Sequence, residues 1–76
     1  MTSIIKVGMV FAGRRSPNVH NEIIRIYTDN GKRMVEVDQY GATLANMDHS
    51  KKATFYVGEI RRALNRGTAD IVLVRQ

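Results

Sequence analysis

The letters of a hydrolytic triad stand side by side at Asp48, His49 and Ser50. A working triad needs three side chains that point at one another, and adjacent residues cannot adopt that arrangement. Asp48 and Ser50 are better explained as caps at the start of a helix. Catalysis would instead require both histidines of the chain to converge with a carboxylate such as Glu22 in one pocket, and no spacing in the sequence indicates this. We therefore predict that the protein is not an enzyme.

Ligands for a metal ion or a nucleotide cofactor are equally sparse. The only histidines are His20 and His49, there is no cysteine, and the spacing of the histidines matches no metal-binding signature. The six glycines are scattered singly, without the Gly-rich or Gly-Lys-Ser/Thr loops that cradle phosphates. The sequence therefore predicts neither a metal nor a cofactor.

The charge balance is the clearest chemical signal in the chain. Twelve Lys or Arg stand against seven Asp or Glu in 76 residues, which gives a net charge of +5 and a pI near 10.1. This balance favours an acidic partner such as nucleic acid, although a charge of this size is also ordinary for a soluble domain. Five of the cations and only one carboxylate, Glu59, fall within residues 50–66. The basic character is thus concentrated in one segment.

An aromatic residue lies within this basic segment. If residues 50–66 form one helix, Phe55, Arg62 and Arg66 lie opposite its apolar stripe. An exposed ring between guanidinium groups can stack on bases and grip phosphates. If residues 53–57 form a strand instead, the ring of Phe55 turns inward and this platform is lost. Tyr27 and Tyr40 are further candidates for stacking.

The expected fold sorts the remaining cations into two groups. Those at 14–15 are expected beside Lys51 and Lys52 at the start of the helix, and those at 32–33 near the arginines at its end. Two basic patches joined by one helix face would follow a phosphate backbone. The predicted interface for nucleic acid or another partner comprises Arg14, Arg15, Lys32, Arg33, Lys51, Lys52, Phe55, Arg61, Arg62 and Arg66.

The best-specified element is a β-hairpin around Asn30-Gly31. This pair favours a two-residue type I′ turn, because both positions need a positive φ. The turn places Asp29 opposite Lys32, Ile26 opposite Val35 and Ile24 opposite Val37, and on the other face Arg25 opposite Glu36 and Tyr27 opposite Met34. The register therefore delivers an aliphatic face and a charge-complementary pair together.

Residues 50–66 are the ambiguous segment. An apolar stripe at helical spacing (Ala53, Tyr56, Val57, Ile60, Ala63 and Leu64) and the stop signal of Gly67 predict one long helix. The competing interpretation is a strand over residues 53–57 with a short helix from Gly58, because residues 54–57 favour β structure. The long helix is the interpretation we carry forward.

Two strongly apolar runs complete the expected fold, at 4–12 and 70–75, and both read as strands covered on two faces. The order β-β-β-α-β predicts a small two-layer α+β domain spanning residues 1–76. Its mixed four-stranded sheet would have the order 4-1-2-3, with the helix packed on one face. No run approaches the ~20 apolar residues of a membrane span, and Lys6 interrupts the only run that resembles a signal peptide. We therefore expect a cytoplasmic protein with no membrane contact.

Two kinds of function fit these features. The first is a non-enzymatic binding module that contacts DNA or RNA through a Lys/Arg surface centred on the helix. The alternative is a regulator or inhibitor, of the phage or mobile-element type, that docks on a larger protein or nucleoprotein. In that case the third strand would be an exposed edge carrying Met34 and Tyr27, available to a partner or to a second copy in a homodimer.

Overall fold

The hairpin is formed around the predicted turn. In the computed structural model, which describes residues 4–41 and 51–75, Asn30 and Gly31 adopt φ values of 52° and 77°. They join β2 (Val19–Asp29) to β3 (Lys32–Gly41). The predicted pairs Asp29–Lys32, Ile26–Val35, Tyr27–Met34 and Arg25–Glu36 are confirmed. The positive φ that the turn requires at both positions thus sets the register from the turn outward.

One predicted pair, Ile24 with Val37, is wrong. Ile23 faces Val37 instead, because β2 contains a bulge between Ile23 and Arg25. A bulge inserts one extra residue in one strand, so it reverses the inside–outside alternation beyond it. It lets Ile23, which is fully buried, and Ile26 both contact the core. Simple alternation would have turned one of them to the opposite face.

The sheet has five strands rather than four. Besides the hairpin, the elements are β1 (Met9–Gly13), β4 (Lys51–Tyr56), α1 (Val57–Arg66) and β5 (Ala69–Val74). The strand order is β4-β3-β2-β1-β5, and every neighbouring pair is antiparallel. The predicted α+β class is confirmed, and so is the pairing of the first strand with the last. The predicted order 4-1-2-3 is retained as β5-β1-β2-β3. The prediction of a mixed, four-stranded sheet is wrong, because the segment predicted as the start of a helix forms β4 and adds a fifth, antiparallel strand beside β3.

The boundary between β4 and α1 decides the topology. Phe55 pairs with Val35 and Tyr56 with Met34, so the β-favouring side chains of this segment extend the sheet. The helix begins only at Val57, next to the Gly58 of the competing interpretation, which is therefore the better one. Gly67 ends it in the left-handed conformation, as predicted, with its N–H bonded to the last carbonyls.

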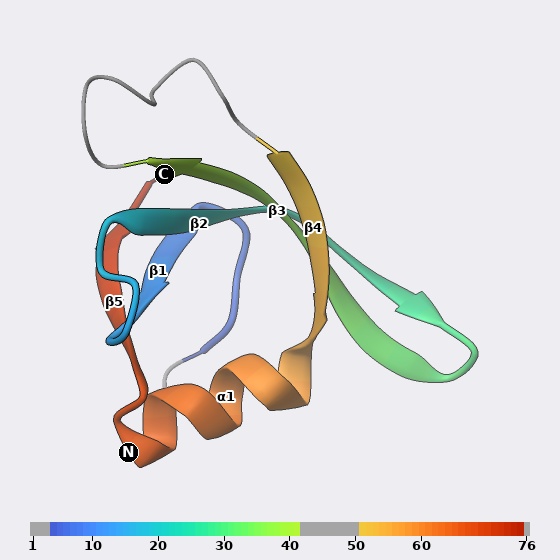
Figure 1. Cartoon of the computed structure of the whole chain (residues 1–76). Coiled ribbons are helices and arrows are strands. Elements are labelled where there is room, and N and C mark those ends of the chain that lie inside the picture. Colours follow the sequence, from blue (N-terminus) through green and yellow to red (C-terminus); the bar gives the residue numbers. More distant parts are fainter. Residues whose placement is uncertain (1–3, 42–50, 76) are drawn as a thin grey trace.

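Helix α1 closes the open side of the curved sheet. It runs from the end of β4 at one edge to the start of β5 at the other, and it contacts β3, β4 and β5 (Figure 1). Val57 and Ile60, one turn apart, are its buried residues. They belong to one apolar cluster that also contains Ile5, Met9, Phe11, Ile23, Val35 and Val37. The core therefore lies between the helix and the inner face of the sheet.

The two apolar runs at the ends of the chain differ in burial. Met9, Val10, Phe11 and Ala12 of β1 are all buried, as expected for a strand in the sheet interior. In β5 the residues from Ile71 to Val74 remain 38–42% exposed, because this strand is an edge of the sheet. The prediction that the last strand is covered on both faces is therefore wrong. The third strand is not an edge either, since β4 pairs with it.

Removal of the Phe55 ring tests this packing. The ring packs against the core cluster and makes an edge contact with Phe11, so Phe55→Ala is expected to lower the free energy of unfolding by about 2–3 kcal/mol. The neighbouring exposed residue provides the control, because Thr54→Ala is expected to cost less than about 1 kcal/mol. Urea unfolding followed by circular dichroism measures both. Equal losses would contradict an inward-facing ring.

Candidate nucleic-acid interface

The predicted basic residues form groups that differ from the expected ones. Because β4 runs antiparallel to β3, it carries the chain from Lys51 to the hairpin end of the sheet. Helix α1 therefore begins beside the hairpin and ends beside the β1–β2 loop, the reverse of the expected direction (Figure 1). The predicted groupings of residues 14–15 with Lys51 and Lys52, and of residues 32–33 with the last arginines of the helix, are therefore wrong.

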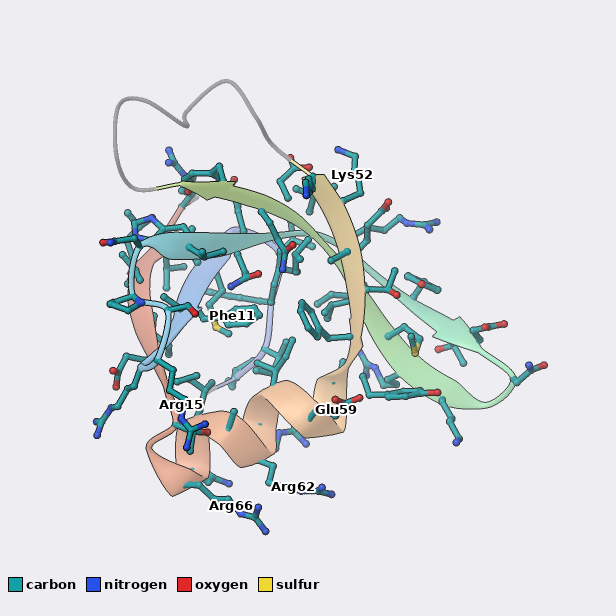
Figure 2. All side chains as sticks on the ribbon, viewed as in Figure 1. Phe11, Arg15, Lys52, Glu59, Arg62 and Arg66 are labelled. Carbon is teal, nitrogen blue, oxygen red and sulfur yellow. The ribbon has the colours of Figure 1, made fainter. Side chains whose placement is uncertain are left out.

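Four arginines border two hollows around the end of α1. The first hollow, of about 320 Å³, lies between Arg14 and Arg15 of the β1–β2 loop and Thr68 after the helix. The second, of about 230 Å³, is lined by Arg62 and Arg66 together with Glu59 and Thr68. We call these four residues the arginine cluster. Figure 2 shows Arg15, Arg62 and Arg66 at this end of the molecule.

Positive charge in the arginine cluster is only partly balanced. Arg14 donates two hydrogen bonds to the carboxylate of Asp70, at 3.1 and 3.3 Å, and this contact raises the pKa of Arg14. In the described part of the chain, no carboxylate lies within ion-pairing distance of Arg15, Arg62 or Arg66. All three side chains belong to exposed residues. Each offers a planar set of N–H donors that suits the oxygens of a phosphate.

Lys32, Arg33 and Arg61 form a second basic group at the other end of α1. They line a broad hollow of about 810 Å³ together with Tyr56 and Gly58. The ammonium group of Lys32 lies 5.3 Å from the centre of the Tyr56 ring, which is a cation–π distance. Cations therefore accompany the helix at both of its ends.

Lys51 and Lys52 are separate from both groups. They begin β4, so the prediction that they stand at the positive end of the helix dipole is wrong. Lys52 donates a 2.6 Å hydrogen bond to Asp38, which raises the pKa of the lysine and neutralises its charge locally. In Figure 2 Lys52 lies at the opposite end of the molecule from Arg62 and Arg66. These two lysines are exposed residues on the edge strand β4 and belong to neither basic group.

The aromatic platform expected at Phe55 does not form. The ring packs inward, 6.1 Å from the ring centre of Phe11, because Phe55 is a strand residue on the core-facing side of β4. The tyrosines named as stacking residues are half-buried, with the Tyr27 ring under the Arg25 guanidinium and the Tyr40 ring against His20. The arginines on the outside of α1 are thus without an exposed aromatic neighbour on the helix itself.

Sequence reasoning missed a pair of amide side chains, Asn21 and Gln39. Asn21 is 7% exposed, donates to the carbonyl of Phe11 at 3.1 Å and accepts from the Gln39 amide at 2.8 Å. The sequence does contain a signal for this pair: Asn21 is two residues before the buried Ile23, so both side chains point to the same face of β2. A polar residue at a core-facing position of a strand must find hydrogen-bond partners.

The described residues contain no candidate metal site beside the basic groups. In residues 4–41 and 51–75, no three His, Asp or Glu side chains are grouped as a metal would require. Asp48, His49 and Ser50, which supplied the triad and cap hypotheses, lie outside the described residues. Within the described ranges, no helix has the length and apolarity that a bilayer crossing needs.

Comparison with protein-family models, with curated proteins and with solved structures finds no match to this chain.

Proposed function

We propose that the protein binds nucleic acid, without catalysis, by contacting phosphates through the arginine cluster. The observation that carries this proposal is that Arg15, Arg62 and Arg66 line two hollows that share Thr68, and that none of the three forms an ion pair with a carboxylate of the described residues. Like charges gathered on a small domain repel one another and do not stabilise it. A polyanion that neutralises them and releases its counterions gains affinity from the same arrangement.

The geometry of α1 supports a chain of phosphates as the ligand. Arg62 and Arg66 are four residues apart, so they project from the same side of the helix, with about 6 Å of axial rise between them. Lys32 and Arg33 supply further cations beside the start of α1, about one helix length from Arg66, on the order of 15 Å, and Arg61 lies between them on the helix. A nucleic-acid backbone offers negative charges repeated over such a distance, whereas a single acidic side chain does not.

The salt dependence of binding tests the proposal. The double substitution Arg62→Gln/Arg66→Gln is expected to weaken binding at low salt. It should also reduce the slope of log K against log salt by about 1.4–1.8, because each phosphate contact contributes about 0.7–0.9. Fluorescence anisotropy of labelled oligonucleotides over a salt series measures both quantities.

A matched variant controls for net charge. Lys51→Gln/Lys52→Gln removes the same number of charges from the edge of β4, far from the arginine cluster, and is expected to leave the slope within about 0.5 of the unmodified protein. Thermal unfolding of both variants checks that folding is intact. An equal loss of slope in the two variants would show that binding depends on net charge alone and not on the arginine cluster. An unchanged slope in the arginine variant would refute the proposal.

One observation favours the second candidate function, docking as a protein-binding regulator or inhibitor. Strand β5 is an edge whose residues Ile71, Val72, Leu73 and Val74 are each about two-fifths exposed. An unpaired apolar edge is a template for strand addition by another chain, including a second copy of this one. The opposite edge, β4, starts with Lys51 and Lys52, charges of the kind that discourage such pairing. The docking edge would thus be β5 rather than the predicted β3.

A charge placed in β5 separates the two candidates. Val72→Lys is expected to leave nucleic-acid affinity unchanged or slightly raised, because it lies on the sheet edge and adds one positive charge. If docking through β5 is the function, the same change should abolish capture of a protein partner that survives high salt and nuclease, and should abolish any dimer seen by analytical ultracentrifugation. A protein complex that tolerates Val72→Lys would exclude the β5 edge as the docking surface.

A further inference from the structure

A pocket enters the molecule between α1 and the inner face of the sheet. Its volume is about 420 Å³, within the ~300–1,000 Å³ range of small-ligand sites. Phe11 of β1, Phe55 of β4 and Ile60 of α1 supply its apolar surface. The two rings meet edge to face at an interplanar angle of 70°, so the apolar wall is partly aromatic. Figure 2 shows Phe11 between the sheet and the helix.

The amide side chains of this pocket, Asn21 and Gln39, lie directly opposite each other on neighbouring strands. Phe11, Asn21 and Gln39 occupy the same cross-strand row of β1, β2 and β3, which places their side chains on the same face of the sheet. Asn21 uses its oxygen and one N–H to bind Gln39 and the Phe11 carbonyl. The carbonyl oxygen and second N–H of the Gln39 amide have no partner among the described residues. The row therefore presents a fixed acceptor and donor beside an aromatic wall.

Arginines lie in hollows next to this pocket, and no cation of the described residues lines the pocket itself. Among the described residues, the only ionised group in its lining is the carboxylate of Glu59, which also lines the hollow of Arg62 and Arg66. The two hollows of the arginine cluster adjoin the pocket, since Thr68 lines all three spaces. An anionic group is therefore unfavourable inside the pocket and favourable at its rim. The chemistry fits a flat, neutral ring bearing hydrogen-bond donors and acceptors, joined to phosphates on either side.

We propose that this pocket receives one unstacked base of a single-stranded nucleic acid, while the phosphates flanking that base lie on the arginine cluster. The proposal rests on the proposed function and specifies its ligand. Stacking on aromatic side chains and hydrogen bonding to the base edges are how unpaired bases are recognised. A base within a duplex cannot reach such a pocket without leaving its stack. The protein thus selects single strands.

Comparison of three probes on the unmodified protein tests this directly. The probes are a single strand of about 12 deoxycytidines, an abasic strand with the same number of phosphates, and a duplex of the same length. The deoxycytidine strand is expected to bind about 5- to 150-fold more tightly than the abasic strand, the gain of one stacked base. The duplex is expected to bind no better than the abasic strand at equal phosphate number.

Two substitutions place the effect in the pocket. Ala63→Met fills the pocket from α1 without changing any charge, and Gln39→Leu removes the amide while preserving its approximate volume. Each is expected to lower the affinity for the deoxycytidine strand to near that for the abasic strand. Thr54→Met is the control, because residue 54 is exposed on β4 and does not line the pocket. It should preserve the preference, and circular dichroism confirms folding of each variant.

The outcomes separate this inference from the proposed function. Equal affinity of the unmodified protein for the deoxycytidine and abasic strands, both of them salt-dependent, would overturn the base pocket and leave phosphate binding intact. A folded Ala63→Met protein that keeps the full preference would also overturn it. Absence of binding to all three probes at low salt would overturn the base pocket and the proposed function together.

Discussion

The packing of α1 across the open side of the sheet is the interaction on which the remaining structure depends. Val57 and Ile60 are the residues of the helix that enter the core, and each contributes about 1.5–3 kcal/mol by burial. A domain of this size has a small stability margin, so these contacts are a large part of it. The same packing connects the two edges of the sheet, since the chain enters α1 from β4 and leaves it into β5 (Figure 1).

The helix also determines where charge lies. With Val57 and Ile60 turned inward, Arg61, Arg62 and Arg66 are left on the exposed side. The end of the helix at Gly67 lies beside Arg14 of the β1–β2 loop. Beside this packed core, a pocket with aromatic and amide side chains in its lining remains open between α1 and the sheet. The packing of the core and the position of the candidate recognition site therefore both depend on α1. The proposed phosphate contacts and the proposed base pocket would both be lost if that helix were displaced.

The elements that the sequence predicts correctly are those determined by residues adjacent in the chain. The Asn30-Gly31 turn is specified by two adjacent residues, so the hairpin register near it follows directly. The strand at Lys51–Tyr56 is decided by pairing with β3, a contact remote in sequence that outweighs the helical spacing of the apolar residues. Because residues 50–66 are predicted as one long helix, the predicted helix runs in the opposite direction to α1. The basic residues predicted to lie near each of its ends are therefore exchanged. Charge density in the sequence predicts the arginines as candidate site residues, and this stays a prediction, whereas the predicted exposure of Phe55 is wrong because its ring faces the core.

An NMR titration of isotope-labelled protein with a single strand of about 12 deoxycytidines at low salt tests the central claim most directly. The account predicts that the side-chain amide signals of Asn21 and Gln39 shift together with the backbone signals of Arg15, Arg62 and Thr68. Shifts confined to Ile71–Val74, or to the lysines that begin β4, would contradict it.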